Sequence, residues 1–322
     1  MLSYIIYSYV YVVMRMGNIT SGILFMVISS FGFALMMAFA KILSNSLPSM
    51  EIVFFRSFIM VIIILIIYSY NYYRHGITKA NKKGGWGKLF IRVFMGGVAM
   101  VSIFYNISTI PLGTATAFAQ SVPIYAVIFG ILFLKEKVSI GVMLATIIGF
   151  VGILLISDPN FNDIALINIV VGILSGVTMA IAFVTLRTLK PYFDNAFLIL
   201  AFGIGNAILG FCGMFLPFDG VGGFSLPNVW EWLLIVCMGT SGTVGQHFLN
   251  KAYINAPVGI VAPIDYSRVI FGIFLGIMLG DAFPNLITSI GIAFIVLSGL
   301  LIAMPALLDD LYRLRNRPNN KS

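Results

Sequence analysis

Charged side chains are scarce in this sequence, and the shortage excludes an ordinary soluble domain. Asp, Glu, Lys and Arg make up 9% of the 322 residues, whereas about 25% is usual for a globular protein. Cysteine and histidine are scarcer still, at two residues each. Cys212 and Cys237 both lie in apolar stretches, so we expect neither a disulfide framework nor a metal site. We also expect no cofactor.

The same shortage argues against two classes of function. A membrane enzyme needs clustered His, Asp or Glu side chains, but His75 and His247 are far apart in the sequence. The chain also has no glycine-rich loop of the kind that binds the phosphates of ATP. A polytopic membrane enzyme is therefore the less favoured function, and ATP-driven transport is disfavoured too.

Apolar residues are what the chain has in abundance. They account for 60% of the sequence, and the mean hydropathy is +1.04. About 20 consecutive apolar residues are needed to cross the hydrocarbon layer of a bilayer. Ten stretches satisfy this length, which predicts an all-α membrane protein with ten transmembrane helices. We place these helices near residues 19–42, 50–70, 89–108, 113–134, 139–157, 164–188, 196–216, 229–251, 257–280 and 285–304.

Lys and Arg residues fall on alternate connections between these stretches, which sets the orientation by the positive-inside rule. The basic side, which we expect to be cytoplasmic, holds Arg15, Arg74, Lys79, Lys82, Lys83, Lys88, Arg92, Lys135, Lys137, Arg187, Lys190, Lys251, Arg313, Arg315, Arg317 and Lys321. The opposite connections have no Lys or Arg and carry Asp158, Asp163, Asp219, Glu231 and Asp281. Both termini are therefore expected in the cytoplasm of a bacterium, with a multi-pass chain in its inner (plasma) membrane. The net charge of +8 flanks the membrane and does not indicate a nucleic-acid partner.

The two ends of the chain lie outside the predicted spans. Residues 1–16 form an apolar N-terminal tail that is too short to cross the bilayer. Two interpretations stay open: the tail precedes the native start at Met14 or Met16, or it lies in the membrane interface. Residues 305–322 form a basic tail that we expect to be cytoplasmic.

The two halves of the chain resemble each other at an offset of 146 residues. Residues 110–113 align with 256–259, Gly130 aligns with Gly276, and Lys41 aligns with Arg187. This predicts two five-helix repeats, over residues 17–158 and 159–304. A repeat with an odd number of spans inserts its second copy upside down. Inverted repeats are typical of alternating-access transporters, whose substrate site lies near the midplane where the repeats meet.

Short motifs in both halves resemble the EamA-type, ten-helix branch of the drug/metabolite transporter superfamily. In the first half, Pro123 is followed thirteen residues later by Glu136, and residues 51–56 resemble the Phe-x-Arg entry of that family. Residues 262–266 and 280–284 resemble the version in the second repeat. The resemblance covers about residues 17–304 and implies a secondary transporter. In the second half, Asp281 replaces the usual Glu, and Arg268 stands thirteen residues before it, where the first repeat has proline. We therefore expect a straighter ninth helix with a charge at that position.

Charges within membrane spans are costly, by about 2.5–3.5 kcal/mol on insertion scales, and mark candidate functional sites. Asp265 and Arg268 share a helix face because they are three residues apart. Gly272, Gly276 and Gly280 continue that face, and we expect them to pack closely inside the protein. The candidate substrate-binding residues are Arg268, Asp265, Tyr266, Arg56, Glu51, Gln120 and Pro123, and the candidates for ion coupling are Asp265 and His247.

Each candidate also has a structural interpretation. Arg56 can be an anchor that pairs with Glu51, and the Asp265–Arg268 pair can be a structural ion pair. Pro123 can be a helix kink that has no contact with the substrate. His247 lies near the basic side, where it can simply be hydrated. The sequence leaves these alternatives open.

The function predicted from these features is secondary active transport of a small organic metabolite by alternating access. The substrate would be an amino acid, a carboxylate or a nucleoside-like compound such as S-adenosylmethionine, and both uptake and export fit. Membrane lipid is the other expected partner, and the protein would be a monomer or homodimer. The alternative is a lipid or carrier-lipid flippase.

Overall fold

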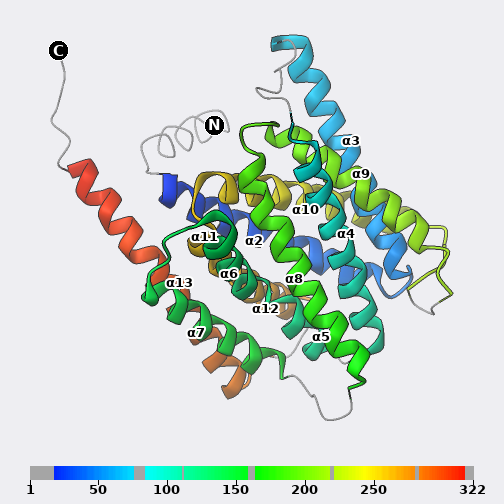
Figure 1. The fold of residues 1–322 in the computed structure, drawn as a ribbon. Coiled ribbons are helices and arrows are strands. Elements are labelled where there is room, and N and C mark those ends of the chain that lie inside the picture. Colours follow the sequence, from blue (N-terminus) through cyan, green and yellow to red (C-terminus); the bar gives the residue numbers. More distant parts are fainter. Residues whose placement is uncertain are drawn as a thin grey trace.

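The computed structural model describes residues 18–75, 84–110, 112–158, 164–217, 221–279 and 283–315. Every regular element in these ranges is a helix (Figure 1), which confirms the all-α prediction. The predicted N-terminal tail, and the charged residues Lys79, Lys82, Lys83, Asp163, Asp219, Asp281, Arg317 and Lys321, lie outside the described residues. The helices are α2 (Asn18–Leu43), α3 (Ser49–His75), α4 (Trp86–Thr109), α5 (Leu112–Ala119), α6 (Val122–Leu134), α7 (Ile140–Ser157), α8 (Leu166–Leu189), α9 (Asn195–Gly213), α10 (Val229–Asn255), α11 (Val258–Ile264), α12 (Ser267–Met278) and α13 (Leu286–Arg315).

Nine stretches of the described residues are long and apolar enough to cross a membrane. Two of them, Thr114–Leu134 and Val258–Met278, each run through a pair of shorter helices, α5 with α6 and α11 with α12. Helix α10 is not among the nine, although it is 27 residues long. Its second half carries the polar residues Gln246, His247 and Asn250, which lower its hydropathy. A multi-pass membrane protein is therefore confirmed, with nine of the ten predicted spans.

The fourth span is broken, although the sequence predicted one helix over residues 113–134. Helix α5 ends at Ala119 and α6 begins at Val122. Across the break the backbone N–H of Ser121 donates to the carbonyl of Phe118 at 3.1 Å, an i to i−3 bond that tightens the turn. The break follows from Pro123, which has no N–H to donate to the carbonyl of Ala119.

The ninth span is broken in the same way, and the prediction that it would be straighter was wrong. The backbone N–H of Asp265 donates to the carbonyl of Ala262 at 3.1 Å, and that of Tyr266 donates to Pro263 at 3.2 Å. Pro263 lies inside α11 and removes one donor from the helical ladder. The comparison of the two halves placed Arg268 opposite Pro123 and so overlooked the proline five residues earlier.

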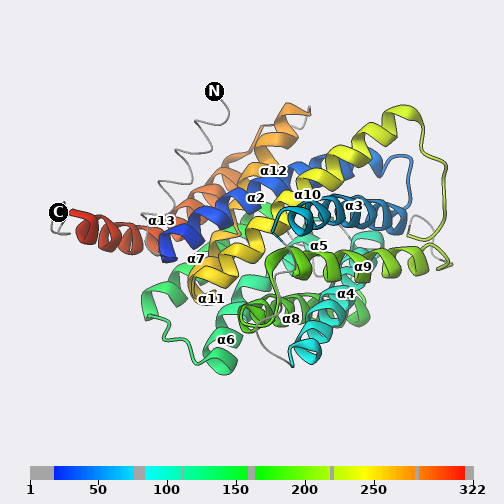
Figure 2. The same ribbon diagram turned by 90° about the horizontal axis from the view of Figure 1, so that it is seen from above.

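Helices from the first half of the chain pack mainly against helices from the second half. Helix α2 lies along α10, and α4 lies along α8 (Figure 2). Two further pairs, α3 with α9 and α7 with α13, also join the halves. The half-helices follow the same rule, because α6 packs on α8 and α11, and α12 packs on α2.

Two of these helix pairs cross at glycines, where the backbones nearly touch. A Cβ atom built on Gly32 of α2 would lie 3.0 Å from the backbone nitrogen of Gly245 in α10. At the α7–α13 crossing, a Cβ on Gly152 would lie 2.6 Å from the carbonyl oxygen of Gly291, and a Cβ on Gly291 would lie 2.7 Å from that of Gly152. Small residues allow this close approach, so neither crossing has room for a side chain.

The two ends of the helix bundle carry different residues. We call the end where α6, α8 and α10 finish the basic end, because Lys135, Arg187, Lys190 and Lys251 lie there; the Lys190 ammonium is 3.5 Å from the carbonyl of Ile254. The other end is called the far end. Helix α13 runs on through Pro305 to Arg315 and projects beyond the other helices (Figure 1, red). The first part of the predicted tail is therefore helical.

Candidate functional site

The break in the ninth span holds an ion pair. Asp265 is the residue that follows α11, and Arg268 lies in the first turn of α12. The Nη2 atom of Arg268 donates to both carboxylate oxygens of Asp265, each at 2.7 Å. The side chains are 20% and 9% exposed, so the pair is largely shielded from solvent. The Nε of Arg268 is buried and has no hydrogen-bond partner among the described residues.

Helix α2 supplies two contacts to this pair that the sequence did not predict. The hydroxyl of Ser30 donates to Oδ1 of Asp265 at 3.0 Å. The guanidinium of Arg268 lies over the ring of Phe33, 4.5 Å from its centroid, which is a cation–π contact. Both residues are brought here by the Gly32–Gly245 crossing of α2 with α10. A polar run at Ser29 and Ser30 within an apolar helix was the only signal in the sequence.

Arg56 of α3 adds a second guanidinium to the same region. It is buried, and it lies within electrostatic reach of Arg268. Its Nε packs beside Gly242 of α10 and has no hydrogen-bond partner among the described residues. Among the described residues, Asp265 is the carboxylate that contacts this pair of cations, through Arg268, so one positive charge is left unbalanced. Like charges in a low dielectric repel each other, so this arrangement favours an incoming anion.

Glu51 does not pair with Arg56 in the part of the chain that the structure describes. Its Oε2 accepts a hydrogen bond from the backbone N–H of Ser225 at 2.9 Å. Glu51 is fully buried, and it ties the start of α3 to the segment before α10 at the far end. The structure thus separates Glu51 from the arginines, although Glu51 and Arg56 lie on the same helix.

Apart from His247, the remaining candidates lie in two places. Pro123 is buried at the start of α6, and Gln120 is half-buried in the break before it. Tyr266 follows Asp265 directly, but its ring packs against Gly149 of α7 and in a cluster with Ile295 of α13. Its hydroxyl is buried and has no partner among the described residues.

His247 lies towards the basic end. Its Nδ1 is 3.1 Å from the side-chain nitrogen of Asn195, which also donates to the His247 carbonyl at 3.2 Å. On the same helix, Gln246 donates to Asn250 at 2.8 Å. The contacts of Asn195 with His247 join α9 to α10.

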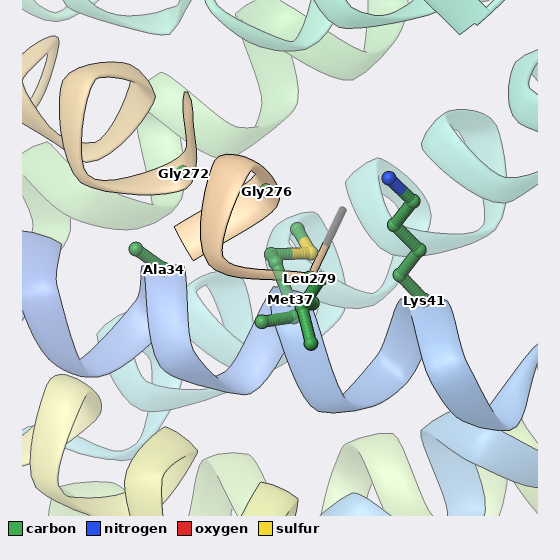
Figure 3. Close-up of a pocket in the computed structure, with 7 residues that line it drawn as sticks. Ala34, Met37, Lys41, Gly272, Gly276 and Leu279 are labelled. Carbon is green, nitrogen blue, oxygen red and sulfur yellow. The ribbon is translucent and has the colours of Figure 1, made fainter. Parts of the chain in front are cut away.

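A groove runs between α2 and α12 towards the far end (Figure 3). It encloses a cavity of about 120 Å³ and is lined by Ala34, Met37, Ala38, Lys41, Gly272, Gly276 and Leu279. A Cβ atom built on Gly272 would meet nothing within 4 Å. The expected close packing along this glycine face is therefore absent at Gly272, while Gly276 is buried and Gly280 lies outside the described residues.

A polar clasp, made of Glu136, Arg187 and Gly259, joins helices at the basic end. Glu136 follows α6, after Lys135 turns the chain with a positive φ of 53°. Oε1 of Glu136 lies 3.2 Å from Nε of Arg187 on α8, and Oε2 accepts a hydrogen bond from the backbone N–H of Gly259 on α11 at 3.2 Å. One carboxylate thus joins three helices, two of which belong to the second half of the chain. The sequence marked Glu136 as part of a family motif but did not predict its partners.

Comparison with known proteins gives the family of the chain. Residues 20–158 match the EamA-like transporter family. The chain is 45% identical over 300 residues to an "Uncharacterized transporter" of Helicobacter pylori strain J99, covering 92% of this chain and 99% of that one. It is 30% identical to the "Pseudopaline exporter CntI" of Pseudomonas aeruginosa strain PAO1, with coverage of 88% and 96%. It is 25% identical to the "S-adenosylmethionine uptake transporter" of Rickettsia conorii, with coverage of 88% and 89%.

The fold is also found among solved structures. A crystal structure matches with a TM-score of 0.72 at 15% sequence identity, and the match covers 90% of this chain and 99% of the other. At that identity the likeness supports the fold alone. Together with the membrane-spanning helices and the relatives at 30% and 45% identity, these matches show that the chain belongs to the EamA-like transporters of the drug/metabolite transporter superfamily, multi-pass proteins of the bacterial inner membrane.

Proposed function

We propose that this protein is a secondary active transporter of a small organic metabolite that carries a carboxylate. Amino acids, organic acids and nucleoside-like compounds such as S-adenosylmethionine fit this class. The observation that supports it most is the pair of guanidinium groups, buried Arg56 and largely shielded Arg268, of which only Arg268 pairs with the Asp265 carboxylate and each of which has an unpartnered Nε among the described residues. A substrate carboxylate would balance the excess charge and accept those N–H donors.

Each residue of the site then has a role. Arg268 and Arg56 bind the substrate carboxylate, since a guanidinium presents several donors in a fixed plane. Asp265 holds Arg268 in place and is the candidate for ion coupling, because it exchanges its partner when the substrate arrives. Ser30 and Phe33 orient the two charged groups. Gln120 and Pro123, at the fourth-span break, and Tyr266 line the substrate's path through the protein. His247 is a second candidate for ion coupling.

We further propose ten spans arranged as two inverted repeats over residues 17–158 and 159–304, with α10 as the tenth span. The packing pairs support this, because exchanging the halves turns the α2–α10 pair into the α8–α4 pair and turns α6–α8 into α12–α2. Each half also has one broken span, at the fourth and the ninth position. Broken helices at the contact between repeats are where transporters of this kind hold their substrates.

The orientation can be tested with reporter fusions. We expect reporters joined after Gly76 and after Lys321 to be cytoplasmic, because the flanking segments carry the Lys and Arg residues. Reporters after Asn160 and Gly222 should be periplasmic. A periplasmic signal after Gly76 would overturn both the orientation and the inverted repeats.

The alternating-access cycle that we propose starts from a state closed at the basic end. The clasp and the contact of α6 with α11 close that end. The other two half-helices, α5 and α12, share no comparable contact among the described residues. If α5 closed towards α12 and Glu136 released Gly259, the site would lose access to one side of the membrane and gain access to the other.

A lipid or carrier-lipid flippase is the second candidate. The observation in its favour is the groove between α2 and α12, whose rims Met37 and Leu279 are 51% and 48% exposed. In a membrane these rims face lipid, so a lipid could enter sideways.

Counterflow in proteoliposomes tests the proposal. Vesicles containing the purified protein are loaded with one unlabelled solute, and the entry of its labelled form is followed. The panel pairs carboxylates with their methyl esters, and includes S-adenosylmethionine and short-chain fluorescent phospholipids. We expect saturable counterflow of at least one carboxylate and not of its ester. Lipid translocation without counterflow of any solute would instead support the flippase.

A further inference from the structure

Arg92 is a buried cation near the start of the third predicted span, residues 89–108. It was grouped with the basic residues after the second span, but it lies inside α4, six residues after the helix begins at Trp86. At 1.5 Å per residue this is roughly 9 Å from the helix end. The residue is only 1% exposed and is among the largest fully buried side chains described.

In the part of the chain that the structure describes, the guanidinium of Arg92 has no hydrogen-bond acceptor. Its Nε, Nη1 and Nη2 atoms are all buried, and none has a partner among the described residues. The group lies over the rings of Phe202, at 4.3 Å from the centroid, and Phe183, at 5.4 Å. These cation–π contacts attract the charge, but ring faces on either side do not satisfy a planar set of N–H donors that point outwards. A buried donor set of this kind is normally paired.

Arg92 also lies where both halves of the chain meet. Phe183 belongs to α8, Phe202 to α9, and Tyr253 of α10 is within electrostatic reach. Helix α4 of the first half packs on α8 and α9 of the second half. The position is in the basic-end half of the bundle, which the Glu136 clasp closes in this state.

We propose that Arg92 is a second anion-binding residue, which receives the substrate carboxylate on the basic-end side of the route once the clasp opens. This inference rests on the proposed transport function and deepens it. The substrate leaves the Arg56–Arg268 site when that site closes, and a second guanidinium further along lowers the barrier for a carboxylate crossing the low-dielectric half of the bundle. The aromatic rings cover Arg92 in the closed state and keep the cation shielded until the anion arrives.

The rival interpretation is that Arg92 only holds Phe183 and Phe202 in position. Lys88 provides a matched control, since it lies one turn earlier on the same face of α4 and stacks on Tyr192 at 4.9 Å. Changing Lys88 to Gln removes the same charge from the same end of the protein, at the edge of the bundle. A general electrostatic effect would reduce anion binding in both the Lys88 and the Arg92 variants. Direct binding of the anion by Arg92 would reduce it in the Arg92 variant only.

The test uses trifluoroacetate as a carboxylate probe, with the full-length protein in lipid nanodiscs and a constant chloride concentration. Binding is measured from the broadening of the ¹⁹F signal, in the wild type and in Glu136→Gln, which weakens the clasp. We expect Glu136→Gln to increase the broadening at least twofold, and Arg92→Gln to remove at least half of the broadening in that background. Lys88→Gln should change it by less than a fifth.

Two further variants make every outcome decisive. If Arg92→Gln does not fold, Arg92→Lys takes its place, because lysine keeps the charge without the planar fork. This variant should weaken the binding of trifluoroacetate at least threefold. Equal broadening in the Arg92 variants and in Lys88→Gln, in both backgrounds, would overturn the proposal. Arg268→Gln should remove a part of the ¹⁹F broadening that the Arg92 variants leave unchanged. Loss at Arg92 with no change at Arg268 would support the second site and reject the first.

Discussion

Changing Arg268 to Ala is expected to reduce counterflow of the transported carboxylate at least a hundredfold. The variant loses the donors that we assign to the substrate, and each charge-assisted hydrogen bond is worth about 1.5–3 kcal/mol. It also leaves Asp265 without its cation in a site where that carboxylate is only 9% exposed. The measurement is counterflow at several solute concentrations, normalised to the amount of reconstituted protein.

Arg268→Lys separates charge from geometry. Lysine keeps the positive charge but cannot reproduce the planar fork of the guanidinium, so we expect the half-saturating concentration to rise about tenfold, with folding unchanged. Lys190→Ala is the control, because this exposed lysine lies at the basic end and contacts the carbonyl of Ile254. A Lys variant with wild-type kinetics would show that Arg268 does not grip a carboxylate.

Changing Gly291 to Val is expected to prevent correct assembly of the protein. A Cβ atom at this position would lie 2.7 Å from the carbonyl oxygen of Gly152, and a backbone oxygen cannot rotate away as a side chain can. Helices α7 and α13 would have to separate, and overpacking of this kind costs about 1–3 kcal/mol or more. We expect less than a tenth of the wild-type amount in the membrane, or a fall of several degrees in the thermal midpoint of the purified protein.

Gly299→Val is the matched control for this prediction. Gly299 is on the same helix, and a Cβ atom built there would meet nothing within 4 Å. The control should therefore accumulate and unfold like the wild type. Similar losses in both variants would mean that glycine matters here for helix formation in general and not for the crossing with α7.

Nine of the ten spans followed from the sequence because they depend on local composition, while the tenth span and the direction of insertion stay predictions. Apolar runs of about 20 residues and the placement of Lys and Arg are readable without tertiary contacts. The break in the ninth span was not predicted, although Pro263 was visible, because the alignment of the halves directed attention to Arg268. Pro123 was read as a kink, and the structure extends this to a full break between Ala119 and Val122.

The candidate site was predictable only where it depends on spacing along one helix. Asp265 and Arg268 are three residues apart, so their shared face followed from helix geometry. Ser30 and Phe33 were missed because they reach the pair through a helix crossing at Gly32 and Gly245, which are far apart in the sequence. Arg92 was missed for another reason. A charge near a helix end resembles an interfacial residue until the neighbouring helices are seen to bury it.

The most direct test of the central claim, that Arg268 binds the substrate, is counterflow by the double variant Asp265→Ala/Arg268→Ala. Removing both charges leaves neither one unpaired, and the replacement of a whole buried ion pair is often neutral for stability. If Arg268 grips the carboxylate, the double variant should fold like the wild type and still show at least a hundredfold less counterflow. Counterflow restored to near the wild-type rate would contradict the account and leave Arg268 and Asp265 as a structural ion pair.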